Sequence, residues 1–169
     1  QVRQVVHSAT PLRGRPEPRA SWTSEALFGE LVTVYDEKDG WAWGQLARDG
    51  YVGYLRSGAL SSQLKPATHC VRALNTFLYP VAEVKAPPWL PLSMTSTVSV
   101  AETGSVFAKL ADGSFVPMRH IADLTWRAPD FVAVAERFMG TPYLWGGKTR
   151  QGLDCSGLVQ VAMQMAGLE

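Results

Sequence analysis

The hydrophobic and polar positions in the first third of the chain fall into short runs that predict β-strands. Three such runs are Leu31–Tyr35, Trp41–Leu46 and Tyr51–Leu55. They are rich in β-branched and aromatic residues, as strands with one buried face are. Asp-Gly pairs at 39–40 and 49–50 separate the runs, and such pairs favour tight hairpins. We therefore expect a small β-barrel in this part of the chain.

The middle of the chain repeats this plan. Val98-Ser99-Val100 echoes Val32-Thr33-Val34, and residues 109–113 echo residues 45–50 with one residue fewer. This internal similarity indicates a diverged duplication. Each copy has the length and turn placement of a bacterial SH3-like barrel, which both segments resemble. The Ala86–Pro91 loop either lies beside a ligand groove or covers a barrel edge, and we expect the second.

The hydrophobic period changes to that of a helix in the last quarter of the chain. Positions i, i+3, i+4 and i+7 of one helix face are Phe131, Val134, Ala135 and Phe138. Asp130 is suited to begin this helix and Gly140 to end it. A second helix is predicted from Asp154 to about Ala166, ended by Gly167. It is apolar on most sides, so we expect it to be central in its domain.

Composition and charge exclude several classes of protein. The 169 residues, of which 46% are hydrophobic and 18% charged, with 15 Gly and 11 Pro, are typical of a folded chain with many turns. A net charge of +1 gives no electrostatic reason to expect nucleic acid as a partner. No segment approaches the roughly 20 apolar residues of a membrane span. The sequence begins at Gln1, not Met, so we expect that an upstream segment was removed or omitted, and an export signal could have been part of it.

Cys155 is the best-placed nucleophile in the sequence. Asp154 is a strong N-cap candidate, which puts Cys155 at the first helical position. Unpaired backbone N–H groups and the positive end of the helix dipole favour an anion there. A thiolate attacks carbonyls, and the same amides can bind the resulting oxyanion. The alternative is a buried structural cysteine at a helix start.

The motif Tyr143-x-Trp145-Gly146-Gly147 precedes a second one, Gly152-x-Asp154-Cys155-Ser156-Gly157-Leu158. Together they closely resemble the NlpC/P60 family over about 30 residues. The resemblance implies a papain-like α+β fold and hydrolysis of peptidoglycan stem peptides, typically between D-glutamate and the following diamino acid. The expected fold class is multidomain: two small SH3-like β-barrels followed by the N-terminal part of a papain-like NlpC/P60 domain. The expected domains are residues 1–65, 66–126 and 127–169.

The resemblance also implies which residues bind the substrate. In family members with N-terminal SH3-like domains, the residues that flank the nucleophile and a tyrosine of the first such domain hold the free amine of an N-terminal L-alanine. By position these are Asp154 and Ser156, with Tyr51 as the tyrosine and Tyr54 in reserve. A carboxylate pairs with an ammonium, and hydroxyls accept its remaining protons. The alternatives are that Asp154 is only a cap, a role that can coexist with amine binding, and that Tyr51 only packs.

A cysteine peptidase also needs a base and a polar residue to orient it. In the family these are a histidine and a further polar residue on strands that follow the cysteine helix. Here His7, His69 and His120 all precede Cys155 and are expected to be surface or loop residues. We therefore expect the base and its orienting residue after Glu169, with the catalytic domain incomplete in this sequence.

No Cys/His cluster has zinc-site spacing and no Gly-rich phosphate loop is present, so we expect neither a metal nor another cofactor. Cys70 is expected to pack, and both cysteines to be reduced. The leading hypothesis is a cysteine endopeptidase that cleaves L-Ala-γ-D-Glu-diamino acid stem peptides with a free N-terminus, in the bacterial cytoplasm or periplasm. The alternative is a peptidoglycan-binding SH3-like module with an inactive cysteine domain. Amidase or acyl-transfer activity would use the same thiol chemistry.

Overall fold

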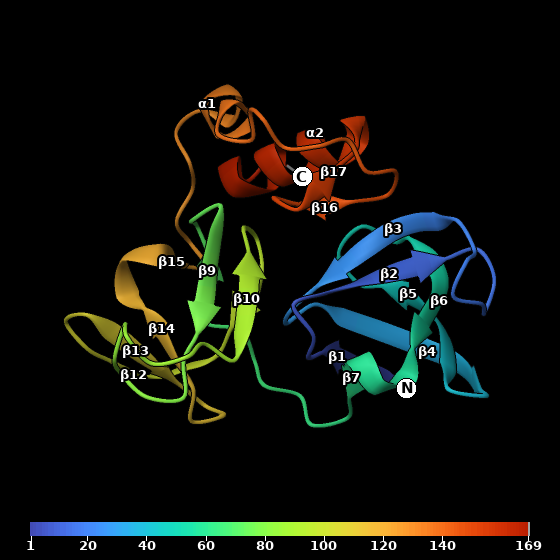
Figure 1. Ribbon diagram of the computed structural model, residues 1–169, viewed down its shortest axis with the longest axis horizontal. Helices are drawn as coiled ribbons and strands as arrows, with labels where there is room; N and C mark the ends of the chain where they lie inside the picture. Colours follow the sequence, from blue (N-terminus) through green and yellow to red (C-terminus); the bar gives the residue numbers. More distant parts are fainter. Residues whose placement is uncertain (169) are drawn as a thin grey trace.

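The computed structural model describes residues 1–168 and is mostly β-structure with two α-helices in that range. Two β units lie side by side, and a segment that contains both helices lies across them (Figure 1). We call residues 2–61 the first β unit, residues 69–123 the second β unit and residues 128–168 the cysteine segment. Each of three hydrophobic clusters is centred on one of these parts.

The first β unit forms one sheet with the strand order β3-β2-β6-β5-β4-β1-β7. Its strands are β1 (Val2–Val5), β2 (Ala9–Arg13), β3 (Trp22–Leu27), β4 (Leu31–Lys38), β5 (Trp41–Leu46), β6 (Val52–Arg56) and β7 (Leu60–Ser61). Asp39 and Gly40, with φ of 51° and 77°, form the β4–β5 hairpin turn, as Asp-Gly pairs favour. The strand and hairpin predictions are confirmed here.

The second β unit divides into three small sheets, β10-β9, β11-β8-β15 and β12-β13-β14. Its strands are β8 (His69–Val71), β9 (Asn75–Leu78), β10 (Leu90–Ser93), β11 (Thr97–Val98), β12 (Val100–Thr103), β13 (Phe107–Leu110), β14 (Phe115–Pro117) and β15 (Ile121–Asp123). β8 pairs with β11 and β15 as β1 pairs with β4 and β7. A short 3-10 helix precedes the last strand in both units, Ser57–Ala59 in the first and Met118–His120 in the second.

The cysteine segment contains α1 (Phe131–Glu136), β16 (Lys148–Thr149), β17 (Gly152–Leu153) and α2 (Cys155–Ala166). Asp130 caps α1, since its carboxylate accepts from the Val132 N–H, and Gly167, with φ of 69°, ends α2. Both helices were predicted, although α1 ends before the turn at Gly140. The expectation that α2 is central holds for one face, because Val159 is 52% exposed.

Side chains from the second β unit complete the core under α2. Met94 and Leu74 join a cluster with Val161, Ala162 and Met165 of the helix. The two β units also meet directly, because the Thr97 N–H donates to the Phe28 carbonyl (N···O 2.9 Å). Together these contacts fix α2 above the junction of the units.

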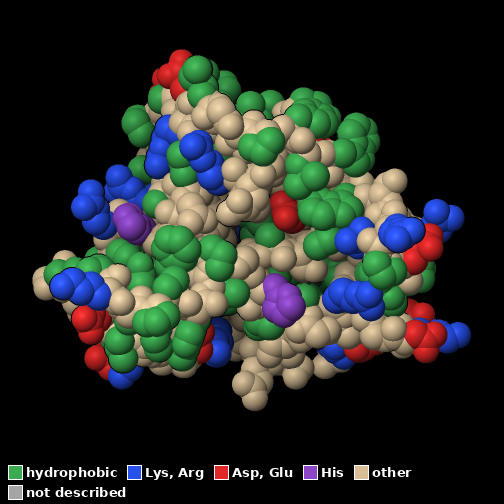
Figure 2. All heavy atoms as spheres, viewed as in Figure 1, with side chains coloured by type: hydrophobic (Ala, Val, Ile, Leu, Met, Phe, Trp, Pro, Cys, Tyr) green, Lys and Arg blue, Asp and Glu red, His purple; other side chains and the backbone are tan. Residues whose placement is uncertain are grey.

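Exposed apolar side chains gather along the upper edge of the molecule, over the helical segment (Figure 2). The large ones in the cysteine segment include Phe131, Val132, Met139, Tyr143 and Trp145. The Ala86–Pro91 loop does not only cover a barrel edge as expected: Trp89 and Leu90 line a cavity of about 320 Å³ between the β units. Among residues 1–168 no helix is long and apolar enough to cross a membrane.

Candidate active site

Cys155 is the first residue of α2 and is exposed. Asp154 has extended backbone angles and its Oδ1 accepts from the Gly157 N–H (N···O 2.7 Å), which is the geometry of an N-cap. The helix start therefore lies where the sequence predicts it. The alternative of a buried structural cysteine is wrong, because the Cys155 side chain is open to solvent.

The Asp154 carboxylate connects the start of α2 to the preceding loop. Its Oδ2 accepts from the Gly146 N–H (2.8 Å), and its Oδ1 also accepts from the Ser156 hydroxyl (3.1 Å). Although burial raises the pKa of Asp154, the hydrogen bonds from Gly157, Gly146 and Ser156 outweigh it and hold this pKa below its ordinary value. Asp154 is therefore a carboxylate at neutral pH.

Glycines allow the loop to approach both α2 and the first β unit. Gly146 has φ of 78°, and a Cβ there would lie 2.8 Å from the Trp22 Cβ. At Gly157 a Cβ would collide with the Gly147 carbonyl oxygen. These positions need glycine because other backbone or side-chain atoms occupy the space of a side chain. The motif glycines thus bring the loop, β3 and the start of α2 together.

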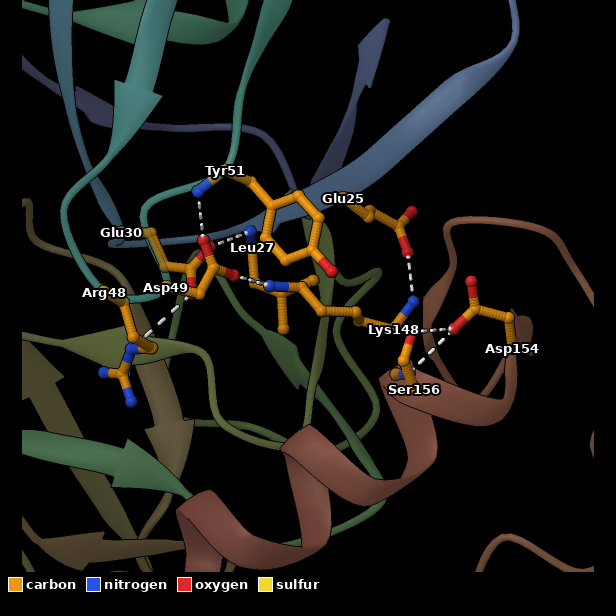
Figure 3. Close-up of polar contacts among 10 residues, drawn as sticks. Glu25, Leu27, Glu30, Arg48, Asp49, Tyr51, Lys148, Asp154 and Ser156 are labelled. Atoms are coloured by element: carbon orange, nitrogen blue, oxygen red, sulfur yellow. Dashed lines mark hydrogen bonds and ion pairs between the residues drawn. The ribbon is translucent and has the colours of Figure 1, made fainter. Parts of the chain in front are cut away.

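Tyr51 meets Asp154 and Ser156 at one small cavity. The cavity is lined by Thr23, Ser24, Tyr51, Gly146, Lys148, Asp154, Ser156, Gly157 and Gln160. Figure 3 shows the Tyr51 ring crossing from the first β unit with its hydroxyl toward Asp154 and Ser156. Tyr51 also packs on the core of the first β unit. Tyr54, the reserve tyrosine, lines a different groove with Trp41 and Trp43.

Tyr143 is a further candidate that the sequence interpretation did not assign to the site, although it begins the Tyr143-x-Trp145-Gly146-Gly147 motif. Its pKa is raised by desolvation, by the charges of Cys155 and Asp154, and by a hydrogen bond to Cys155. A phenol in this position donates a hydrogen bond toward the sulfur or toward an oxyanion formed beside it.

A group of buried charges lies between the first β unit and the cysteine segment, and the sequence interpretation missed it. Lys148 Nζ pairs with Asp49 Oδ2 (2.9 Å), and the Lys148 N–H donates to Glu25 Oε2 (2.9 Å). Burial raises the pKa of Glu25 above its ordinary 4.5, although Lys148 opposes this shift. Burial raises the pKa of Glu30 as well.

The histidines lie in the β units; the expectation of a surface or loop position holds for His7, whereas His69 is half-buried in β8 and His120 half-buried in a 3-10 helix. His69 is hydrogen-bonded to Thr68, and His120 to Thr76. His7 is exposed between β1 and β2. Cys70 is half-buried on β8, and burial raises the pKa of its thiol. Residues 1–168 contain no group of three or more His, Cys, Asp or Glu side chains that could hold a metal ion.

Comparison with known proteins identifies two parts of the chain. Residues 12–60 match the bacterial dipeptidyl-peptidase SH3 domain, and residues 140–169 match the NlpC/P60 family. The chain is 25% identical over 169 residues to gamma-D-glutamyl-L-lysine dipeptidyl-peptidase of Bacillus cereus, covering 86% of this chain and 50% of that protein. It is 26% identical over 188 residues to dipeptidyl-peptidase 6 of Lysinibacillus sphaericus, covering 97% of this chain and 69% of that protein.

A solved structure shows the same fold. The crystal structure of an NlpC/P60 family protein from Bacillus cereus ATCC 10987 superposes with a TM-score of 0.81 at 18% identity, covering 99% of this chain and 73% of that one. The present chain spans about half the length of the Bacillus cereus relative.

Fold and site together define an SH3 domain joined to a segment with an exposed, helix-capped cysteine. The family resemblance carried by the motif around Cys155 is confirmed by these matches. Residues 140–169 therefore match the NlpC/P60 family, and the chain as a whole shares the fold of an NlpC/P60 family protein.

Proposed function

We propose that the whole protein is a cysteine endopeptidase that hydrolyses the γ-D-glutamyl-diamino acid bond of peptidoglycan stem peptides with a free N-terminal L-alanine. The observation that carries this proposal is the convergence of Tyr51, Asp154 and Ser156 on one cavity beside the exposed Cys155. The name of the Bacillus cereus relative supports the bond class. We propose that the protein acts in the bacterial cytoplasm or periplasm.

The cavity has the chemistry to bind an ammonium group. A carboxylate offers about four acceptor sites, and Asp154 uses two on Oδ1 and one on Oδ2 for the protein itself. The carboxylate keeps its negative charge while it accepts these hydrogen bonds, so it attracts an ammonium group, and the hydroxyls of Tyr51 and Ser156 can accept hydrogen bonds from that group. Capping and amine recognition therefore coexist in one side chain.

The reaction follows from the position of Cys155. Its thiolate adds to the γ-carbonyl of D-glutamate, and backbone amides at the start of α2 bind the oxyanion. Collapse of the intermediate breaks the C–N bond, the departing amine takes a proton, and water then hydrolyses the thioester. We propose that the histidine that moves these protons, and the polar residue that orients it, follow Glu169.

We also propose the finer architecture: SH3-like barrels at residues 1–65 and 66–126, and the start of a papain-like domain at 127–169. The matching connections of β8, β11 and β15 with those of β1, β4 and β7 support a second barrel. The unmatched part of the relatives' length supports a longer catalytic domain.

The test is hydrolysis of L-Ala-γ-D-Glu-diaminopimelate, free and N-acetylated, by the whole protein. We expect cleavage of the free peptide, a loss of at least about 10⁴-fold in kcat for Cys155→Ala, and no change for the matched control Cys70→Ala. Tyr51→Phe is expected to raise KM for the free peptide about tenfold. Cleavage that persists in Cys155→Ala would show that Cys155 is not the nucleophile. Equal cleavage of the acetylated peptide would show that Asp154, Ser156 and Tyr51 do not recognise the free amine.

A second candidate is peptidoglycan binding by the SH3-like part, with an inactive cysteine domain. A groove of about 350 Å³ favours it, because Trp43, which is 38% exposed, lines this groove beside Tyr54 and the more buried Trp41, and an exposed aromatic ring offers an apolar face to a ligand. Sedimentation with insoluble peptidoglycan distinguishes the two: binding lost in Trp43→Ala, with neither peptide cleaved by the unaltered protein, would favour this candidate.

A further inference from the structure

Lys148 and Asp49 form a nearly buried ion pair across the junction between the cysteine segment and the first β unit (Figure 3). The Nζ···Oδ2 distance is 2.9 Å, and the side chains are 7% and 17% exposed. Breaking such a pair by removing one partner leaves an uncompensated charge away from water. The pair is therefore a geometric restraint rather than a solvated surface contact.

The same Asp49 carboxylate also holds the backbone of Tyr51. Its second oxygen, Oδ1, accepts from the Tyr51 N–H (3.1 Å). Gly50, between them, has φ of 75°, so the turn is a tight one. One carboxylate thus links the tyrosine of the first β unit to Lys148 of the cysteine segment.

Lys148 is in turn joined to the other side of the cavity. It lies in β16 opposite Leu153 of β17, and Asp154 follows Leu153 directly. Its backbone N–H donates to Glu25 of β3, which anchors this hairpin on the first β unit. A continuous set of contacts therefore runs from Tyr51 through Asp49 and Lys148 to Asp154.

The pair also controls charge at the cavity. Lys148 lines the same cavity as Asp154 and Ser156, and a substrate ammonium placed there would meet a like charge. Asp49 neutralises Lys148 at a contact distance of 2.9 Å. Without Asp49, Glu25 and Glu30 would still offset part of the Lys148 charge, and the rest would oppose ammonium binding, because like charges at close range cost binding energy.

We propose that Lys148 is a positioning residue which, through Asp49, sets the Tyr51 hydroxyl against Asp154 and Ser156 and so determines the preference for a free N-terminal amine. This inference rests on the proposed function. Lys148 acts through Tyr51. Asp49 has two roles: it connects Lys148 to the Tyr51 backbone, and it neutralises the charge of Lys148.

The test is steady-state kinetics of the whole protein on the free and acetylated peptides. Lys148→Met is expected to raise KM for the free peptide about tenfold while kcat changes less than about twofold. Asp49→Asn is expected to cost more, because it leaves the Lys148 charge at the cavity. Adding Lys148→Met to Asp49→Asn is expected to recover part of that loss, so the two effects are not additive.

Control variants and a second readout separate this inference from the proposed function. Lys109→Met, in an exposed pair with Glu102, is expected to change neither KM nor kcat. Hydrogen exchange at the Tyr51 amide, followed by NMR, is expected to become at least about tenfold faster in Lys148→Met than in the unaltered protein.

An unchanged Tyr51 exchange rate would overturn the positioning role. Equal losses for the free and acetylated peptides, or strictly additive effects of the two substitutions, would overturn the role in amine preference. Faster Tyr51 exchange in a protein that cleaves neither peptide would support the restraint and reject the proposed function.

Discussion

The two β units hold the cysteine segment by different kinds of contact. The first β unit uses polar contacts: Glu25 and Asp49 to Lys148, and the Trp22 carbonyl to the Trp145 indole. The second β unit inserts Met94 and Leu74 into the core beneath α2 and adds an exposed polar contact, in which Arg137 donates to the Arg72 carbonyl. Hydrogen bonds depend on direction, whereas apolar contacts depend mainly on area. The first unit therefore orients the site, and the second contributes stability.

The largest expected effect tests the supporting role of the second β unit. Met94 is 1% exposed in the shared core, so Met94→Ala is expected to lower the free energy of unfolding by about 2–5 kcal/mol. Denaturant unfolding measures this loss. The kcat and KM of the folded protein are expected to stay unchanged on the free peptide.

Met139→Ala is the matched control, since Met139 is 78% exposed and its loss is expected to cost less than about 0.5 kcal/mol. A changed KM in folded Met94→Ala would show that the second β unit also orients the site, contrary to the comparison drawn above.

The next effect is a pH dependence of stability that arises at the polar junction, the set of polar contacts between the first β unit and the cysteine segment. Burial raises the pKa of Glu25 above 4.5, so the folded state binds more protons than the unfolded state between 4.5 and the raised value. The free energy of unfolding therefore falls as pH rises through this window, by about 1.4 kcal/mol per unit of difference in pKa. Glu25→Gln is expected to flatten the slope in pH-dependent unfolding.

The raised pKa of Glu30 also makes the free energy of unfolding fall with rising pH, so Glu25→Gln is expected to leave part of this pH dependence. Glu83→Gln, at an exposed position in the second β unit, is expected to leave all of it. A Glu25→Gln protein with the slope of the unaltered protein would show that the junction with the first β unit is not the source.

The smallest effect concerns the single hydrogen bond from Trp145 to β3. The indole N–H donates to the Trp22 carbonyl (3.1 Å) from a side chain that is 65% exposed. Trp145→Phe is expected to cost about 0.5–1.5 kcal/mol in thermal unfolding. Trp89→Phe, also at an exposed indole, is the control and is expected to cost less. Equal costs would mean that this contact adds nothing to the polar junction.

Local patterns in the sequence predicted what local forces determine. The Asp39-Gly40 hairpin, the Asp130 and Asp154 caps and the helix end at Gly167 all follow from side-chain or backbone preferences of a few neighbouring residues. The exposed Cys155 at the start of α2 follows from the same reasoning.

Contacts between distant parts of the chain could not be predicted in this way. The two partners of Lys148, Asp49 and Glu25, lie 99 and 123 residues away in the sequence. Nothing in the sequence around either residue indicates that it contacts Lys148. The exposure of Val159 depends on what packs on α2 rather than on the helix itself. The division of the second β unit into three sheets likewise reflects pairings that short runs do not specify.

The cavity shared by Tyr51 and Asp154 has a consequence for synthesis of the protein. Domains generally fold as units from the N-terminus while the chain is being made, so the first β unit exists before the ribosome has produced Cys155. The thiol then emerges onto a partner that is already folded. The tyrosine that lines the cavity is thus in place before the residues that flank the thiol, Asp154 and Ser156, reach it.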